Sequence, residues 1–319
     1  MSQNKSTNLH LTRRSFLLSA SGLILAPFTS FKPLQSVFAA NHVTLPMITR
    51  AIPASGEMLP VIGMGSWKTF DVGNDQSDRA RCVKILQTFF NRGGGMIDSS
   101  PMYGSSQEVI GHCLAQLQPH PGLFSATKVW IIGKSFGISQ MEKSQALWGG
   151  QRFDLMQIHN MLNWRAHLET LKEWKAEGRI RYIGVTTSHG RRHAKLEKAL
   201  LDEDFDFVQF TYNVIDREAE QRLLPLAAER GIAVIINRPF QRGALFDRVK
   251  DKPLPAWAAE FDCENWAQFF LKFIVSNPAV TCAIPATSQV AHMQENMGAA
   301  YGALPDKAMR AQMIRYLSA

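Results

Sequence analysis

The sequence is poor in cysteine and contains no low-complexity tract. Its 319 residues include four cysteines, Cys82, Cys113, Cys263 and Cys282, and no two of them form a CxxC pair. Cysteines this far apart in sequence do not make a zinc-binding or thioredoxin-like motif. Buried free thiols are the expected state, and the spacing alone leaves a disulfide open.

A glycine-rich turn for a nucleotide is also missing. Residues 62–67 read IGMGSW and lack the third glycine of a GxGxxG turn. The run Gly93-Gly94-Gly95 is not followed by the Lys-Ser/Thr pair of a phosphate-binding loop. The first absence counts against a doubly wound α/β sheet, and the second counts against a P-loop protein.

Acidic residues are absent from the first 39 positions. That segment holds four basic residues, Lys5, Arg13, Arg14 and Lys32, which account for half of the net charge of +8. The rest of the chain is therefore weakly basic, and a weak, dispersed charge gives little basis for binding nucleic acid. We expect no nucleic-acid partner.

The same N-terminal segment has the pattern of a targeting signal. Arg13 and Arg14 precede an apolar stretch, 16–28, that polar residues interrupt and that is shorter than the roughly 20 residues of a membrane span. The arrangement resembles a twin-arginine (Tat) signal peptide, and the small residues near Ala39 predict removal of residues 1–39. The resemblance implies a periplasmic protein that the Tat machinery exports folded, without stable membrane insertion after cleavage. An uncut anchor and a disordered tail are the alternatives.

From about residue 46 the chain alternates short β-branched runs with amphipathic stretches. A hairpin comes first, with strands at 48–52 and 59–62 and a turn at 55–57. Strand-like runs follow at 61–65, 96–99, 123–128, 153–159, 180–186, 207–211, 233–237 and 280–285. Helical periodicity separates them at 77–90, 107–117, 138–147, 165–177, 193–201, 218–230 and 265–275. The alternation predicts one α/β domain over residues 40–319, a (β/α)₈ TIM barrel with an N-terminal β-hairpin and a C-terminal helical tail.

Four ionisable or polar residues follow consecutive strands of this predicted barrel. Asp98 and Tyr103 come after the second strand, Lys128 ends the third, and His159 ends the fourth. The carboxyl ends of barrel strands share one face, where barrel enzymes carry their chemistry. Each residue alone has a plainer interpretation, as a helix cap, a core tyrosine or a core histidine, but together they predict a single site.

These residue types suit the reduction of a carbonyl group. The new alkoxide needs a proton, and a tyrosine can donate it if a nearby ammonium group lowers its pKa. We expect Lys128 to lower the pKa of Tyr103, Asp98 to pair with Lys128, and His159 to hydrogen-bond the carbonyl oxygen.

The order and spacing of Asp98, Tyr103, Lys128 and His159 resemble the complete catalytic tetrad of the aldo-keto reductases. Further similarity runs along most of residues 46–300, including LPVIGMGSW at 59–67, DLMQIH at 154–159 and GRIRYIGV at 178–185. The resemblance implies an NAD(P)-dependent oxidoreductase that interconverts an aldehyde or ketone and an alcohol, with Tyr103 as general acid and base.

The resemblance also assigns residues to the cofactor, with departures from the family pattern. In the family, the loop after the last strand and a following Glu-Asn pair hold the adenosine phosphate and adenine. Here the lysine and arginine of NADPH-preferring members are replaced by Ala286 and His292, while Arg238 or Arg242 could reach a phosphate. NADP(H) is favoured slightly over NAD(H). The predicted adenosine-side residues are Ala286, Thr287, Ser288, His292, Glu295 and Asn296.

The nicotinamide end departs from the pattern as well. Thr186 and Thr187 stand where the family has Ser-Asn, Gln209 matches a residue that holds the carboxamide, and Phe240 is the candidate for stacking. The tryptophans Trp67, Trp130 and Trp164 either line an apolar substrate pocket or cap the barrel.

No metal is expected. His189 and His193 have the spacing of two zinc ligands on a helix, but no acidic or cysteine partner accompanies them and two arginines lie between them. The alternative to an enzyme is a non-catalytic nucleotide-binding barrel that acts as a regulatory or redox-sensing partner.

Overall fold

The computed structural model describes residues 45–120, 122–150 and 152–318. The predicted signal peptide, residues 1–39, lies outside the described residues. Within the described part, none of the helices combines the length and apolar character needed to cross a membrane.

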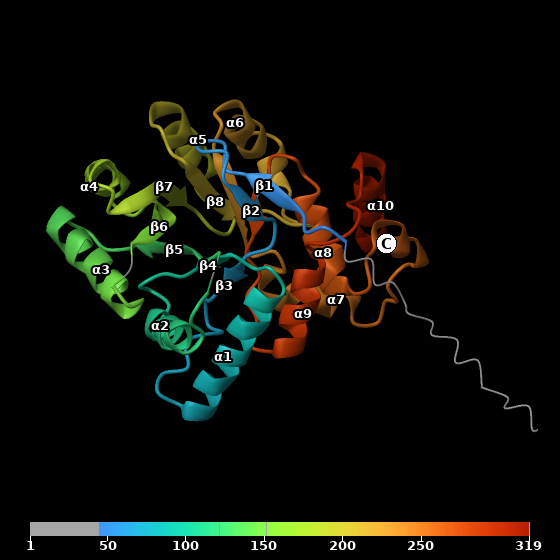
Figure 1. Ribbon diagram of the computed structural model, residues 1–319. Coiled ribbons are helices and arrows are strands. Elements are labelled where there is room, and N and C mark those ends of the chain that lie inside the picture. Colours follow the sequence, from blue (N-terminus) through green and yellow to red (C-terminus); the bar gives the residue numbers. More distant parts are fainter. Residues whose placement is uncertain (1–44, 121, 151, 319) are drawn as a thin grey trace, which may run out of the picture. The chain divides into compact units, whose positions relative to one another are not determined.

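Eight parallel strands form a closed barrel (Figure 1). Strand order follows the sequence, and each strand pairs with the next along the chain. The barrel closes where Ile62 bridges to Ala283, and the amide of Gly65 donates to the carbonyl of Pro285 at 3.0 Å. The strands are β3 (Met64–Gly65), β4 (Met96–Asp98), β5 (Phe124–Val129), β6 (Phe153–Ile158), β7 (Ile180–Thr186), β8 (Phe207–Thr211), β9 (Ala233–Asn237) and β10 (Cys282–Ala283).

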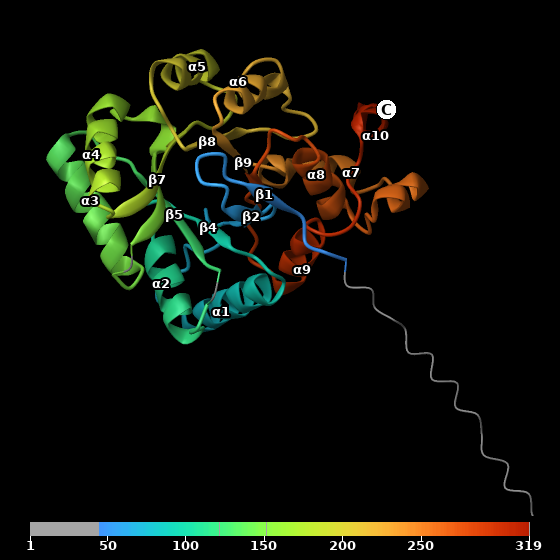
Figure 2. The same ribbon diagram turned by 45° about the horizontal axis from the view of Figure 1, so that its top comes forward.

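Helices surround the strands and confirm the predicted fold class (Figure 2). The first five are α1 (Gln76–Asn91), α2 (Ser106–Gln116), α3 (Lys134–Leu147), α4 (Trp164–Ala176) and α5 (His193–Asp202). The rest are α6 (Leu223–Glu229), α7 (Ala244–Val249), α8 (Trp266–Val275), α9 (Val290–Gly298) and α10 (Lys307–Ser318), the last being the helical tail.

One predicted helix is shorter than the periodicity of its sequence. The stretch 218–230 contains a 3₁₀ turn at Glu218–Glu220 and then α6, which begins at Leu223. Pro225 explains the break, because a proline has no N–H to bond the carbonyl of Gln221 and is tolerated in a first helical turn. Helix α7 has no counterpart among the predicted elements.

The N-terminal hairpin, β1 (Thr49–Ala51) and β2 (Met58–Pro60), contacts the amino end of the barrel. The Tyr182 hydroxyl donates to Ser55 Oγ at 2.7 Å, and Tyr182 lies near the start of β7. The rings of Phe124, Tyr182 and Phe207 pack together just inside this end, with centroids 5.5–5.9 Å apart. The carboxyl ends of the strands are left for the site.

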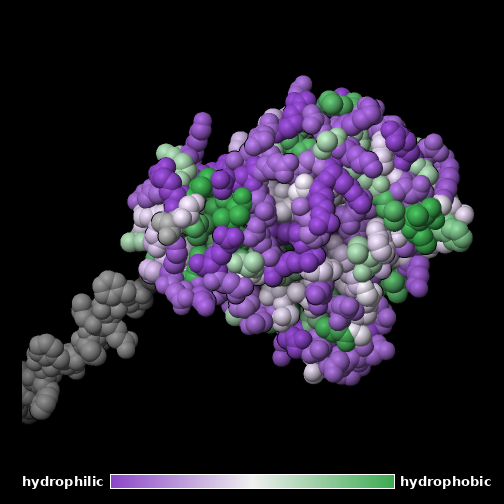
Figure 3. Space-filling model, turned by 180° about the vertical axis from the view of Figure 1, so that it is seen from behind, coloured by the Kyte–Doolittle hydropathy of each residue, from purple (hydrophilic) through white to green (hydrophobic). Residues whose placement is uncertain are grey.

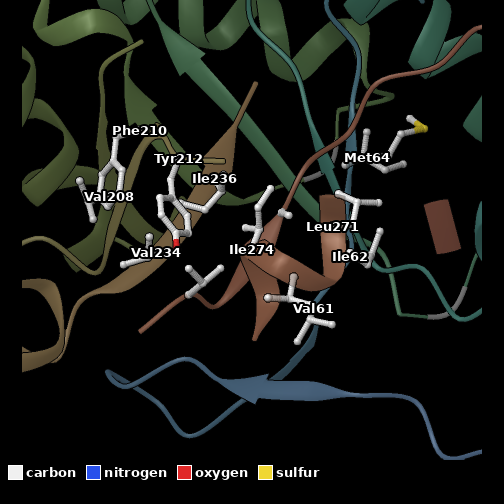
Figure 4. Close-up of a cluster of buried hydrophobic side chains, with 14 of the residues drawn as sticks. Val61, Ile62, Met64, Val208, Phe210, Tyr212, Val234, Ile236, Leu271 and Ile274 are labelled. Atoms are coloured by element: carbon white, nitrogen blue, oxygen red, sulfur yellow. The ribbon is translucent and has the colours of Figure 1, made fainter. Parts of the chain in front are cut away.

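The main hydrophobic core lies between the barrel and its helices. Outward-facing residues such as Val234 and Ile236 on β9 lie on the side of Ile274 on α8, while Leu271 of the same helix lies beside Ile62 (Figure 4). All four cysteines are buried and free, which confirms the expectation of free thiols.

A buried lysine joins this core to the C-terminal part of the chain. Lys272 on α8 is completely buried, and four backbone carbonyls lie within hydrogen-bond distance of its ammonium, whose three N–H groups they share. The acceptors are Phe261 at 2.6 Å, Asp262 at 2.9 Å, Tyr301 at 2.8 Å and Ala303 at 3.0 Å. One side chain therefore holds the 3₁₀ turn at Ala256–Phe261 against the segment that leads to α10.

We expect Lys272→Met to lower the free energy of unfolding by about 3 kcal/mol, because buried carbonyls lose a charged donor without access to water. Urea unfolding followed by circular dichroism measures this change. The matched control is Lys250→Met, whose side chain is 73% exposed. That control should shift the free energy of unfolding by less than about 0.5 kcal/mol. Equal effects of the two variants would contradict a stabilising role for the contacts of Lys272 with the four carbonyls.

Candidate active site

The structure brings the four predicted catalytic residues together at the carboxyl ends of the strands. Asp98 ends β4, Lys128 is on β5, and His159 directly follows β6. Tyr103 lies in the loop after β4, and its ring meets that of His159 edge-on with centroids 5.8 Å apart. The Lys128 ammonium lies 5.3 Å from the centre of the Tyr103 ring.

Asp98 and Lys128 form a buried ion pair behind Tyr103. The Lys128 ammonium contacts Asp98 Oδ2 and donates to the carbonyl of Ser99 at 2.8 Å. Asp98 Oδ1 accepts hydrogen bonds from Gln157 Nε2 at 2.8 Å and Gln209 Nε2 at 3.2 Å. Both carboxylate oxygens are satisfied, as a buried charge requires.

Gln157 is a site residue that was not predicted from the sequence. It could have been found because it is a polar residue two positions before His159, and side chains two positions apart along a strand point to the same face, here the barrel interior. Gln209, predicted to hold a carboxamide, also donates to Gln157 Oε1 at 3.2 Å, so both of its amide hydrogens are used within the protein.

The prediction that Lys128 lowers the pKa of Tyr103 was wrong for the free protein. Burial raises the pKa of Tyr103 above its usual value, and the charge of Asp98 raises it further. Burial is the larger cause, and the Lys128 ammonium over the ring face is itself paired with Asp98. Tyr103 therefore holds its proton as a neutral phenol.

His159 is uncharged for a related reason. Burial, followed by the charge of Lys128, holds the pKa of His159 well below its usual value. Its Nδ1 lies 2.8 Å from the hydroxyl of Ser100, a second buried residue that was not predicted from the sequence. Two neutral groups, a phenol and an imidazole, thus line the same wall.

A cavity of about 540 Å³ opens beside these groups. Figure 3, seen from behind the view of Figure 1, shows the surface hollowed near its centre. A volume of this size suits a small ligand and part of a nucleotide. Of the predicted site residues, the cavity is lined by Trp67, Asp98, Tyr103, His159, Thr186, Thr187, Gln209, Arg238, Phe240 and Ala286.

The other two tryptophans differ in position. Trp130 is not among the residues that line the cavity, but it is 39% exposed and its ring centroid lies 6.4 Å from that of His159, which does line it. Trp164 does not line the cavity, contrary to the pocket-lining interpretation. It is the first residue of α4, so its ring packs in the outer layer against Phe205 and beneath Arg165.

The adenosine-side residues lie on the loop after β10 and on α9. Ala286 reaches the cavity, and the Thr287 hydroxyl accepts from the amide of Gln289 at 3.1 Å, just before α9 begins. Asn296 is buried, Glu295 is half-buried, and Ser288 and His292 are exposed. This segment presents hydroxyls and amides rather than cations.

The wall beyond β7 has an unsatisfied hydroxyl that a ligand can use. Thr187 is 2% exposed and lines the cavity, and its Oγ1 has no hydrogen-bond partner among the described residues. The neighbouring Thr186 Oγ1 accepts from the amide of Asn160 at 3.0 Å and so supports a loop. A buried polar atom without a partner is costly, so Thr187 fits the carboxamide of a nicotinamide ring.

Phe240 and Asn237 complete this wall after β9. The ring of Phe240 packs against Phe246 and Phe270 in tilted and edge-on contacts, with centroids 4.9 and 6.3 Å away. Asn237, which was not predicted as a site residue, donates to the carbonyl of Thr187 at 2.8 Å and ties β9 to the end of β7.

A cationic rim borders the cavity on the same side. Arg242 lies over the Trp67 ring at 4.3 Å and contacts His189 Nε2 at 3.3 Å. Burial and the charge of Arg242 lower the pKa of Arg238, and Arg191 adds to the effect. Within the described part of the chain, none of these three arginines pairs with a carboxylate. Unpaired guanidinium groups of this kind suit a phosphate.

The rim is built on a strained backbone. His189, Arg238 and Arg242 have φ values of 69°, 53° and 62°, in the left-handed region that side chains other than glycine rarely adopt. Such conformations persist where the surroundings hold them, and they gather at ligand sites.

The family model described as the aldo/keto reductase family matches residues 61–313, more than half of the chain. An NADH-specific methylglyoxal reductase of Escherichia coli (strain K12) is 27% identical over 231 residues, which cover 62% of this chain and 68% of that protein. An uncharacterized oxidoreductase of Schizosaccharomyces pombe is 26% identical over 260 residues, covering 75% of this chain and 78% of that protein.

A solved structure supports the fold. An aldo-keto reductase from Klebsiella pneumoniae in complex with NADPH matches with a TM-score of 0.70 at 22% identity, covering 85% of this chain and 96% of that chain. The geometry of the four residues and the extent of the family match point the same way. The chain belongs to the aldo/keto reductase family.

Proposed function

We propose that the protein is an NAD(P)-dependent oxidoreductase that interconverts a small aldehyde or ketone and its alcohol. The observation that carries the proposal is the buried Asp98–Lys128 pair behind Tyr103, with His159 facing the same cavity. Family membership and the oxidoreductase names of its relatives support it.

When bound, a reduced nicotinamide supplies the hydride for the carbonyl carbon, and the protein's own groups handle the oxygen. Tyr103 donates its phenolic proton to that oxygen, because its raised pKa keeps the proton in place beforehand. Once the proton leaves, the phenolate lies beside the Asp98–Lys128 pair, whose ammonium is 5.3 Å from the centre of the Tyr103 ring. His159 donates a hydrogen bond that orients the oxygen. In alcohol oxidation, the Tyr103 phenolate takes the proton back.

The nicotinamide end is proposed to meet Thr187 and Gln209, and the adenosine end the loop and helix from Ala286 to Asn296. The cationic rim of Arg191, Arg238 and Arg242 supplies the positive charge that this segment lacks, and it supports NADP(H) over NAD(H). Titration of tryptophan fluorescence with each nucleotide tests the preference. If Arg242→Gln binds NADPH as tightly as the native protein, the cationic rim does not contribute to nucleotide binding.

The remaining wall is proposed as the substrate pocket. Met102 and Trp67 line the cavity, and the ring of Trp130 lies beside that of His159, which also lines it. These apolar side chains follow β3, β4 and β5, whereas Thr187 and Gln209, proposed for the nicotinamide, directly follow β7 and lie on β8, respectively.

We expect kcat/KM for straight-chain aldehydes to rise about two- to fourfold per added methylene from propanal to hexanal, because each methylene leaves water for an apolar wall. Initial rates at saturating nucleotide measure the slope. Trp130→Ala should flatten it while leaving propanal nearly unaffected. If the slope is unchanged in Trp130→Ala, the alkyl chain of the substrate does not contact Trp130.

The pH profile of reduction follows from the two shifted groups. A raised pKa keeps Tyr103 protonated above the ordinary tyrosine value of about 10, and a lowered pKa keeps His159 neutral below the ordinary histidine value of about 6.5. We therefore expect kcat for carbonyl reduction to be flat between these limits. Stopped assays on protein whose folding is checked at each pH measure this, and an acid limb centred near 6.5 would contradict it.

Export by the Tat route to the periplasm is part of the proposal. It rests on Arg13 and Arg14 before an apolar stretch and on the small residues at Ala39 and Ala40. Intact-mass analysis of exported protein tests it. A chain that begins at Ala40 agrees with the proposal, and a retained Met1 contradicts cleavage.

A further inference from the structure

Ser100 and His159 share a buried hydrogen bond whose direction decides the chemistry of the imidazole. Ser100 is fully buried, His159 is 6% exposed, and the serine Oγ lies 2.8 Å from Nδ1. The two residues come from different strands, since Ser100 follows β4 and His159 follows β6. The contact therefore depends on the barrel and not on local chain geometry.

The other hydrogen bonds of Ser100 settle which atom donates. Its Oγ already accepts from the amide of Met102 at 3.3 Å. If Nδ1 carried a proton and donated it to Oγ, the serine hydroxyl proton would have no acceptor among the described residues. If the serine donates to Nδ1, every one of these buried groups is satisfied. Because a buried donor without an acceptor is costly, the second arrangement is the stable one.

We propose that Ser100 is a positioning residue that fixes His159 as the tautomer protonated at Nε2. In a neutral imidazole one nitrogen donates and the other accepts, so a hydroxyl donating to Nδ1 leaves the proton on Nε2. Nδ1 faces Ser100, and no hydrogen bond of Nε2 is found among the described residues, while His159 lines the cavity. The free donor is thus Nε2–H, aimed at a substrate oxygen.

The consequence for the reaction rests on the proposed function. A carbonyl oxygen needs a hydrogen-bond donor, and a neutral imidazole in the other tautomer would present a lone pair that repels it. The neutral state of His159 makes the tautomer decisive, because a doubly protonated ring would donate from either nitrogen. Ser100 acts through His159 and does not itself touch the substrate.

The direct test is nitrogen-15 NMR of histidine-labelled protein without nucleotide or substrate. The chain has nine histidines, and the His159 signals are identified by their loss in His159→Gln. The expected spectrum shows a protonated Nε2 and an unprotonated Nδ1 that accepts a hydrogen bond. A protonated Nδ1 in the native protein would overturn the proposal without any activity measurement.

Variants link the tautomer to turnover. Ser100→Ala is expected to give a mixture of tautomers and to lower kcat for aldehyde reduction roughly tenfold, the equivalent of one hydrogen bond. Ser100→Thr keeps the hydroxyl, so both the single tautomer and the native kcat should be retained. The control is Ser144→Ala, another buried serine whose hydroxyl pairs with Gln107 on the outside of the barrel, and it should change neither.

The outcomes separate this inference from the proposed function. The Nε2–H form in a protein that reduces no carbonyl would leave the tautomer proposal standing and refute the enzyme. Turnover in Ser100→Ala equal to that of the native protein, with the tautomers mixed, would overturn the role of Ser100 in the reaction.

Discussion

Tyr103→Phe reduces aldehydes at a rate about a thousandfold below that of the native protein, while its affinity for nucleotide stays within twofold. The expected loss lies within the range of about 10²–10⁴ that a positioned general acid contributes. Only the hydroxyl is removed, so the ring can keep its edge-on contact with His159 and its place below the Lys128 ammonium.

The measurement pairs single-turnover reduction with a fluorescence titration of nucleotide. Tyr316→Phe is the matched control, because its hydroxyl bonds the carbonyl of Pro253 at the C-terminal helix, far along the chain from the site. It should lose nothing. Native turnover in Tyr103→Phe would sink the assignment of Tyr103, and lost nucleotide affinity would make its role binding instead of proton transfer.

Asp98→Asn should lower the free energy of unfolding by about 3–5 kcal/mol, because it leaves the fully buried Lys128 ammonium without its carboxylate. Turnover should fall as well, since the ammonium loses the partner that holds it beside Tyr103. Urea unfolding and kcat are measured on the same preparation.

Two further variants isolate the pair. Lys128→Met combined with Asp98→Asn removes both charges, so stability should recover in part while turnover stays low. Glu173→Gln breaks a surface pair with Lys134 whose side chains are 56% and 45% exposed, and should cost less than about 1 kcal/mol. Equal losses for the buried and the surface pair would contradict the assigned role of burial.

The barrel was predictable from sequence because its strands are buried on both sides. The runs 180–186, 207–211 and 233–237 match β7, β8 and β9 in both bounds, since each is a mainly apolar stretch in which nearly every residue is buried. Strands β3 and β10 are shorter than the ranges predicted for them, 61–65 and 280–285. Their length is set by hydrogen-bond pairing where the barrel closes and not by the pattern of side chains.

The site was predictable only in part. Asp98, Tyr103, Lys128 and His159 follow the barrel rule that chemistry lies at the carboxyl ends of strands. Ser100 and Gln157 were missed because their roles depend on partners 59 residues away, which only the closed barrel brings close. The direction of the shift in the Tyr103 pKa depends mainly on burial, and the local sequence does not determine how deeply a side chain is buried.

The most direct test of the central claim uses nicotinamide nucleotide deuterated at the transferable position of C4, with a simple aldehyde such as hexanal. If the protein is a carbonyl reductase, mass spectrometry finds one deuterium on the carbonyl carbon of the alcohol, and Tyr103→Phe forms almost none. The opposite result is that no alcohol forms although nucleotide binds, and that Tyr103→Phe behaves like the native protein. That result would contradict the proposed reductase and favour a non-catalytic nucleotide-binding barrel.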